Sequence, residues 1–214
     1  MLQAIRTWWP LLLGVLAMQL GNGLQATSVG LRIDAAGFGP AALATVLSGM
    51  YVGGVVASVI GPRYIVWMRH VPAYVTLVLL AALAPAAFLV REDVVFWTLA
   101  RFAFGFALSG IFIVIESWLN DCVANTMRGR VFAIYILIQL GGLMAAQFLV
   151  PLFAGHIDIA MLAVIGFALL AIPPVLLGRA PRCGLMCRPR LPRWSRPRRS
   201  ALRAPPSRAS SGRW

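Results

Sequence analysis

Six long apolar stretches occupy almost all of the first 178 residues, and they constrain the fold more than any other feature of the sequence. Each has roughly the 17–25 residues that an α-helix needs to cross about 30 Å of hydrocarbon, which is longer than most helices of a water-soluble core. The sequence therefore predicts an all-α membrane protein with six transmembrane helices. Their approximate bounds are Trp8–Gly30, Gly39–Ile60, Pro72–Val90, Val94–Trp118, Val131–Phe153 and Ile157–Leu177.

Composition and charge divide the chain into two parts. Hydrophobic residues make up 60% of the sequence and charged residues 12%, whereas soluble domains are roughly 25% charged. The formal net charge of +13 is concentrated at the end of the chain, because residues 179–214 contain 11 arginines, six prolines and no acidic residue. We expect a six-span transmembrane domain over residues 1–178 and an Arg/Pro-rich, disordered cytoplasmic tail over residues 179–214.

The tail allows several interpretations. Clustered arginine beside a transmembrane span is attracted to the anionic headgroups of a lipid bilayer, so the tail suits contact with lipid or with a protein partner. A shifted reading frame in GC-rich DNA also produces a segment of this composition. The tail contains no folded module that would position a basic arm, and we expect no nucleic-acid partner.

Loop charge predicts the orientation of the spans. Two short loops on one side carry Arg63, Arg69, Arg128 and Arg130, and Arg6 and the tail lie on the same side. The opposite loops combine acidic with basic residues. Because basic residues concentrate in short cytoplasmic loops, we expect a multi-pass protein of a bacterial-type inner (plasma) membrane with both termini in the cytoplasm. Five tryptophans fall near span ends, where indole rings favour the headgroup zone: Trp8, Trp9, Trp67, Trp97 and Trp118.

Small residues recur at intervals that let helices pack closely. Gly49 and Gly53 are four residues apart in the second span, and Gly141 and Ala145 have the same spacing in the fifth. Such pairs allow two helix backbones to approach each other within a membrane. They predict a compact helical bundle without indicating what it binds.

The fourth span carries an unusual polar stripe. Arg101, Gly105, Ser109, Phe112 and Glu116 are spaced three or four residues apart, so they share one face of a helix. Arg101 lies about seven residues, or roughly 10 Å, inside the predicted outer boundary. Two interpretations remain open for it. Its side chain either extends outward toward the headgroups, near the acidic loop that precedes the span, or faces a transport cavity inside the bundle.

Amide side chains interrupt two other spans. Gln19, Asn22 and Gln25 follow one broad face of the first span, and Gln139 and Gln147 lie eight residues apart in the fifth. Amides in hydrocarbon need hydrogen-bond partners, so these faces are expected to point into the bundle. They either bind a polar solute in a cavity or join neighbouring helices.

A group of charges lies at the cytoplasmic ends of the spans. Glu116 is within reach of Arg63, Arg128 and Arg130 in the predicted topology. A charge network of these four residues would hold neighbouring helix ends together and stabilise one conformation of the bundle. The simpler interpretation is that Glu116 is an interfacial carboxylate in contact with water.

No residue pattern indicates catalysis, a metal or a cofactor. His70 and His156 fall on opposite predicted sides of the membrane, so they cannot share a metal ion. Ser109 and Gly110 lack a nearby histidine within the span. There is also no phosphate-binding glycine loop with a lysine. We therefore expect a protein that is not an enzyme and that uses no cofactor.

Several segments resemble the N-terminal six-helix half of the major facilitator superfamily. The similarity extends over residues 8–178. The segments that carry it are Gly49–Gly54, Gly61–Arg63, Arg101–Gly105, Glu116–Asp121 and Arg128–Val131. The loop after the second span departs from the family pattern, because the expected acidic residue is missing there and only Arg69 and His70 match the paired basic positions.

The resemblance implies secondary transport of a small solute by alternating access, around a site near the bilayer midplane. Gln19, Asn22, Gln25 and Arg101, with Gln139 of the fifth span, would then face the central cavity. A coupling ion is common in such carriers, although no carboxylate lies deep in these spans.

The resemblance also implies that a complete carrier needs a second six-helix half or a second copy of the chain. The tail begins where the family has its central loop, so we expect a truncated or frameshifted product. The alternative is a non-transporting six-span scaffold or partner subunit, whose basic tail contacts lipid or protein.

Overall fold

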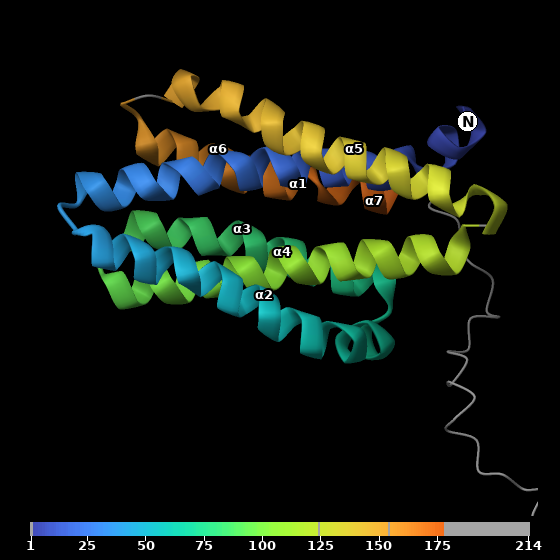
Figure 1. The fold of residues 1–214 in the computed structure, drawn as a ribbon, viewed down its shortest axis with the longest axis horizontal. Helices are drawn as coiled ribbons and strands as arrows, with labels where there is room; N and C mark the ends of the chain where they lie inside the picture. Colours follow the sequence, from blue (N-terminus) through green and yellow to red (C-terminus); the bar gives the residue numbers. More distant parts are fainter. Residues whose placement is uncertain (1, 124, 154, 178–214) are drawn as a thin grey trace, which may run out of the picture. The chain divides into compact units, whose positions relative to one another are not determined.

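A computed structural model of the chain describes residues 2–123, 125–153 and 155–177, with side chains from residue 8 onward. The tail predicted over 179–214 lies outside the described residues. All regular structure in the described part is helical, as the sequence predicts. The elements are α1 Leu2–Ala35, α2 Pro40–Met68, α3 His70–Val90, α4 Val94–Cys122, α5 Asn125–Leu149, a 3-10 turn η1 Val150–Phe153, α6 Ile157–Leu170 and α7 Ile172–Leu177 (Figure 1).

Five helical segments are long and apolar enough to cross a membrane, which identifies the chain as an integral membrane protein by length and composition. They are Pro40–Met68, His70–Val90, Val94–Cys122, Asn125–Phe153 and Ile157–Leu177. The predicted first span is a 34-residue helix, α1, but it is not among these five. The amide groups of Gln19, Asn22 and Gln25 lower the hydropathy of its central turns.

The helices extend further than the apolar stretches do. The described parts of residues 62–71 and 119–130, which were predicted as loops, are helical except at Arg69 and Val123. The helix α2 continues through Pro62, since helices in membrane proteins tolerate an internal proline. Hydropathy marks only the part of a helix that suits hydrocarbon, so the polar turns beyond it were wrongly predicted as loops.

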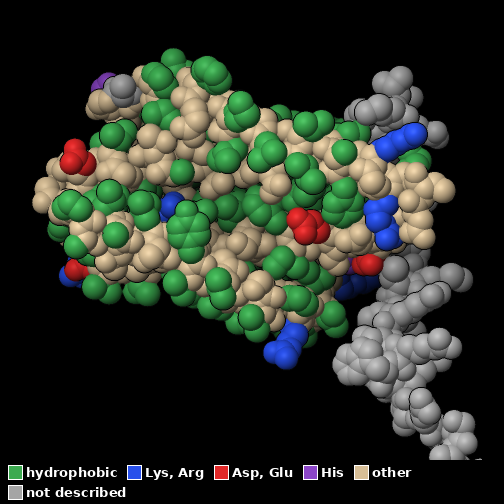
Figure 2. Space-filling view, viewed as in Figure 1, with side chains coloured by type: hydrophobic (Ala, Val, Ile, Leu, Met, Phe, Trp, Pro, Cys, Tyr) green, Lys and Arg blue, Asp and Glu red, His purple; other side chains and the backbone are tan. Residues whose placement is uncertain are grey.

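Successive long helices alternate in direction, so their connections gather at two ends (Figure 1). Residues 36–39, 91–93 and 154–156 connect helices at one end, which we call the outer end after the predicted topology. Arg69 and residues 123–124 connect helices at the other, the inner end. Figure 2 shows that one face of the helical domain is largely apolar, with charged side chains mostly near these two ends. This distribution suits a bundle surrounded by lipid.

The packing of the helices repeats internally. The pairs that pack most extensively are α2–α4, α4–α3, α3–α6, α6–α1 and α1–α5. Exchanging the first three long helices for the last three, so that α1 replaces α4, α2 replaces α5 and α3 replaces α6, reproduces the same five pairs. The first and second halves of the helical domain therefore use equivalent packing.

Glycines bring α2 and α4 into main-chain contact. An added Cβ at Gly49 would lie 2.7 Å from the carbonyl oxygen of Thr98, and one at Gly53 would collide with the carbonyl oxygen of Phe102. On α4, Gly105 faces the main chain of Met50 in the same way. The predicted close-packing pair of the second span is thus confirmed.

The predicted packing pair of the fifth span is wrong by one residue. Gly141 has nothing within 4 Å of an added Cβ, and Ala145 is exposed. The next residues, Gly142 and Ala146, are buried against α1, where an added Cβ at Gly23 would lie 2.5 Å from Ala146 Cβ. A shift of one residue rotates the packing face by about 100°, which spacing alone does not resolve.

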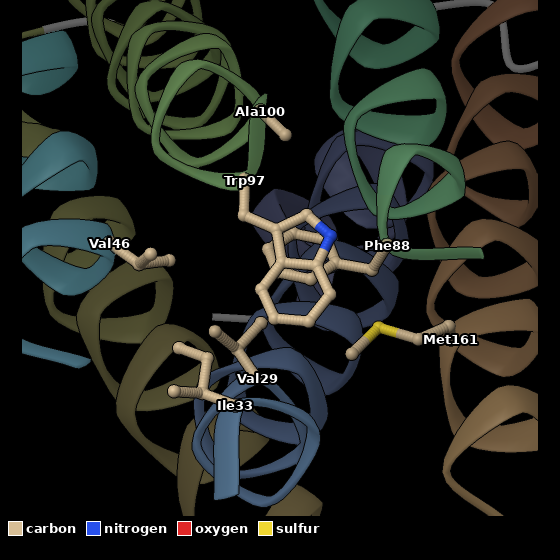
Figure 3. Packing of buried hydrophobic residues seen from close by; sticks show 7 residues of the cluster. All are labelled: Val29, Ile33, Val46, Phe88, Trp97, Ala100 and Met161. Atoms are coloured by element: carbon tan, nitrogen blue, oxygen red, sulfur yellow. The ribbon is translucent and has the colours of Figure 1, made fainter. Parts of the chain in front are cut away.

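An apolar cluster closes the domain near the outer end. It contains residues from α1, α2, α3, α4 and α6, and we call it the Trp97 cluster: Val29, Ile33, Val46, Phe88, Trp97, Ala100 and Met161 (Figure 3). The indole of Trp97 stacks on Phe88 with 5.2 Å between ring centroids. Trp97 is fully buried, so the prediction that it anchors at the headgroups is wrong.

Candidate functional site

The side chain of Arg101 lies inside the bundle and does not extend toward the headgroups. It is 3% exposed, although it carries a formal charge on a membrane-spanning helix. Its Nη1 donates to Gln25 Oε1 at 3.2 Å, and its Nη2 donates to Met50 Sδ at 3.1 Å. The guanidinium carbon also lies 5.9 Å from the centroid of the Phe104 ring. Arg101 thus bridges α4 to both α1 and α2.

The acidic residues nearest to Arg101 in the sequence are engaged elsewhere. Asp93 accepts a hydrogen bond from the main-chain nitrogen of Phe96 at 2.8 Å and so caps the start of α4. Glu92 lies 3.6 Å from Arg32, in an ion pair at the outer end. The interpretation that Arg101 reaches outward to this acidic loop is therefore wrong.

Arg101 has no carboxylate partner among the described residues. None of the ion pairs in that part of the chain includes its guanidinium. The buried Nε of Arg101 and the buried Nε2 of Gln25 both find no hydrogen-bond acceptor within the described part of the chain. Burying a charge or a polar group without a partner is costly, and charges inside membrane domains usually mark a functional site.

Two glutamines join α1 to α5. Gln19 Nε2 of α1 donates to the carbonyl oxygen of Gln139 at 3.1 Å, and Gln147 Nε2 of α5 donates to the carbonyl oxygen of Gly23 at 3.3 Å. Asn22 Nδ2 donates to Gln19 Oε1 at 3.1 Å within α1. Gln19 and Gln147 therefore act as links between helices, whereas Gln25 is the amide that contacts Arg101.

The Trp97 cluster lies one helical turn from the Arg101 site on three helices. Val29 follows Gln25 by four residues on α1, Val46 precedes Met50 by four on α2, and Trp97 precedes Arg101 by four on α4. Residues four apart lie on the same face of a helix. The cluster therefore separates the polar site from the outer end.

Arg32 connects three segments of the chain at the outer end. It lies 3.0 Å from Asp158 of α6 and 3.6 Å from Glu92 of the α3–α4 loop. Loop charge had shown opposite signs on this side, but the pairing across loops depends on the tertiary fold. This ion network lies beyond the Trp97 cluster and adds a second layer to the closed outer end.

The predicted inner-end charges are not joined to one another in the described part of the chain. Glu116 is exposed, and the Tyr135 hydroxyl donates to its Oε1 at 3.4 Å. Arg128 Nη2 donates to the carbonyl oxygen of Asn120 at 3.0 Å, and Arg63 and Arg130 are exposed. The described contacts of Glu116 thus favour the simpler interpretation of an interfacial carboxylate.

A different pair, which the sequence analysis missed, lies at the same end. His70 Nε2 lies 3.4 Å from Asp121 Oδ2 and 3.4 Å from Ser117 Oγ, which connects the start of α3 to the end of α4. The His70 ring also lies 5.8 Å from that of Trp118. No signal in the sequence links residues 47–51 positions apart, so only the fold reveals this contact.

Comparisons with models of known protein families, with curated proteins and with solved structures found no match to this chain. Across the described residues, no three His, Cys, Asp or Glu side chains are grouped so as to hold a metal ion.

Proposed function

We propose that the chain is one six-helix half of a secondary transporter of the major facilitator type, which moves a small solute by alternating access. The observation that carries this proposal is the internal repeat in helix packing, in which α1–α3 and α4–α6 form the same set of helix pairs. Carriers of this type consist of six-helix halves, each built from two inverted three-helix repeats. The sequence resemblance points to the same architecture.

The buried polar pair of Arg101 and Gln25 supports a solute site. These residues lie on α1 and α4, which the internal repeat exchanges for each other, and transporter sites form at the interface between repeats. The Trp97 cluster and the Arg32 network close the outer end, which corresponds to one of the two states that alternating access requires.

A second half completes the carrier in this proposal, and a second copy of the chain is the simplest way to supply it. The expected setting is a bacterial-type inner membrane with both termini in the cytoplasm. Reporter fusions test this orientation: a fluorescent protein fused after Leu177 should fluoresce, and alkaline phosphatase at the same position should be inactive.

Solute flux tests the proposed function. The purified chain is reconstituted in vesicles at two protein-to-lipid ratios, and uptake of radiolabelled anionic, neutral and cationic solutes is measured. A carrier of two copies should give saturable uptake that rises more than proportionally with protein density. Uptake equal to that of empty vesicles for every solute at both densities would reject the carrier and leave the scaffold or partner subunit.

A further inference from the structure

We propose that Arg101 and Gln25 bind the carboxylate of a small monoanionic organic acid, with Met50 as a displaceable cover. This inference rests on the proposed function, because it names the class of solute for that site. It starts from an imbalance in hydrogen bonding. The groups left without partners are both N–H donors, namely Nε of Arg101 and Nε2 of Gln25. The missing group is therefore an acceptor.

The charge at the site decides which kind of acceptor fits. The described residues give Arg101 a neutral amide oxygen and a thioether sulfur as its acceptors, so its positive charge is uncompensated. A neutral carbonyl or hydroxyl group would leave that charge unchanged. A dianion such as hydrogen phosphate would replace it with a net negative charge in the same apolar surroundings. One negative charge neutralises the site, which favours a monoanion.

The geometry of a guanidinium further favours a carboxylate. Its planar set of N–H groups matches two carboxylate oxygens in a bidentate pair, which is shorter and stronger than a contact between neutral groups. The unused Nε of Arg101 lies on one edge of that plane. The nearby Gln25 Nε2 supplies a further donor for the same anion.

Met50 is suited to make way for such a ligand. Its sulfur is a weak acceptor for Arg101 Nη2, and methionine side chains are flexible. Met50 is also only partly buried, whereas Arg101 and Gln25 are 3% and 0% exposed. A carboxylate oxygen is a much stronger acceptor for a guanidinium, so it should displace the sulfur.

The helices α1 and α4 are joined at this level by the long side chains of Gln25 and Arg101 and are not among the extensively packed helix pairs. Gln25 and Arg101 are buried, so a ligand reaches them by displacing the Met50 side chain. The ring of Phe104 borders the guanidinium, so a ligand with an apolar body fits this region. The Trp97 cluster blocks the way from the outer end.

Benzoate and benzamide test the proposal, because they share a shape and differ in charge. The full chain is purified in dodecyl maltoside in an alkaline buffer, in which inorganic phosphate is almost entirely the dianion, and its midpoint of thermal unfolding is measured with each compound and with inorganic phosphate. Isothermal titration then gives the dissociation constant. We expect benzoate to raise the midpoint saturably, with benzamide and phosphate at least ten-fold weaker. An equal response to benzoate and benzamide, or no response to benzoate, would overturn the proposal.

Two variants of the site and one control sharpen the test. Arg101→Gln should weaken benzoate binding at least ten-fold, yet be no less stable without ligand, because it removes an uncompensated charge. Gln25→Glu places a carboxylate of nearly identical shape beside Arg101. It should raise the unfolding midpoint without ligand and abolish the benzoate response. Arg32→Gln removes a charge at the outer end and should keep that response.

The variants also distinguish a carboxylate-binding site from a purely structural role of Arg101. Unchanged benzoate binding in Gln25→Glu would overturn the proposal even if Arg101→Gln fails to fold. Strong destabilisation of folded Arg101→Gln would show that the Arg101 guanidinium stabilises the domain without a ligand, and would equally overturn it. Binding is measured without transport, so benzoate binding without flux would reject only the proposed carrier, and flux without benzoate binding would reject only this site.

Discussion

Replacing Gly105 with alanine should destabilise the helical domain, although alanine forms helices more readily than glycine. An added Cβ at Gly105 would lie 2.7 Å from the carbonyl carbon of Met50 and 2.8 Å from its Cα. These are main-chain atoms of α2, so no side-chain rotation relieves the collision. The two helices must move apart instead.

The size of the effect follows from that separation. Ordinary contact at 3.4 Å or more requires α2 to move by over half an ångström, and a gap of about 0.5–1 Å loses a quarter to a half of the dispersion energy between facing atoms. Overpacking of this kind costs about 1–3 kcal/mol. The better helix propensity of alanine offsets up to ~1 kcal/mol of this overpacking cost. We expect a net loss of about 1–2 kcal/mol in the free energy of unfolding for Gly105→Ala.

Gly141→Ala is the matched control, because Gly141 also lies within a predicted span but has nothing within 4 Å of an added Cβ. This variant should be stabilised by about 0.5–1 kcal/mol. Both free energies of unfolding are measured in dodecyl maltoside micelles titrated with sodium dodecyl sulfate, with helix content followed by far-ultraviolet circular dichroism. If Gly105→Ala is as stable as Gly141→Ala, the close contact between α2 and α4 is refuted.

Three further predictions use the same unfolding assay. Gln147→Ala should cost about 0.6–1.7 kcal/mol, because it loses the hydrogen bonds of Gln147 to α1. Gln139→Ala should be nearly neutral, because Gln139 accepts from Gln19 through its main-chain carbonyl. Equal costs for the two variants would contradict this assignment. Arg32→Gln should cost less than about 1 kcal/mol, because the acidic partners of Arg32 are more than half exposed. This loss of stability should become smaller at high salt. A loss that does not depend on salt would argue against the ion network. Tyr135→Phe should cost no more than about 1 kcal/mol, because it removes one 3.4 Å hydrogen bond to an exposed Glu116, and a larger loss would indicate a more extensive inner network.

The sequence predicted where the helices lie better than it predicted how they face one another. Apolar length is a property of the chain alone, so six long helices could be expected with roughly correct bounds. Contact faces depend on the partner helix, which is why Gly142 and not Gly141 packs against α1. Trp97 was misplaced for the same reason, because its position near a span end did not reveal the Phe88 ring of α3 on which it stacks.

The candidate site was predictable by residue type but not by pairing. The amides within apolar spans were sufficient to predict that their faces point into the bundle, whereas the sequence left two positions open for the Arg101 side chain. The contact between Gln25 and Arg101 joins residues 76 positions apart, and no local pattern distinguishes Gln25 from Gln19. For the charges at the inner end, the sequence suggested a pairing that the described contacts do not include. Glu116 was expected near Arg63, Arg128 and Arg130, but its described hydrogen bond is with Tyr135.

The most direct test of the central claim is whether water-soluble reagents reach Gln25. A Gln25→Cys variant in vesicles is treated with a charged, membrane-impermeant thiol reagent from one side or the other, with the unsubstituted chain as background. Leu137→Cys serves as the lipid-facing control, since Leu137 is 70% exposed on the surface of α5. If Gln25 faces a cavity that opens at the inner end, Gln25→Cys should be labelled from the inner end and little from the outer end, and Leu137→Cys should not be labelled. A Gln25→Cys variant that is labelled from neither end would show that Gln25 faces no such cavity.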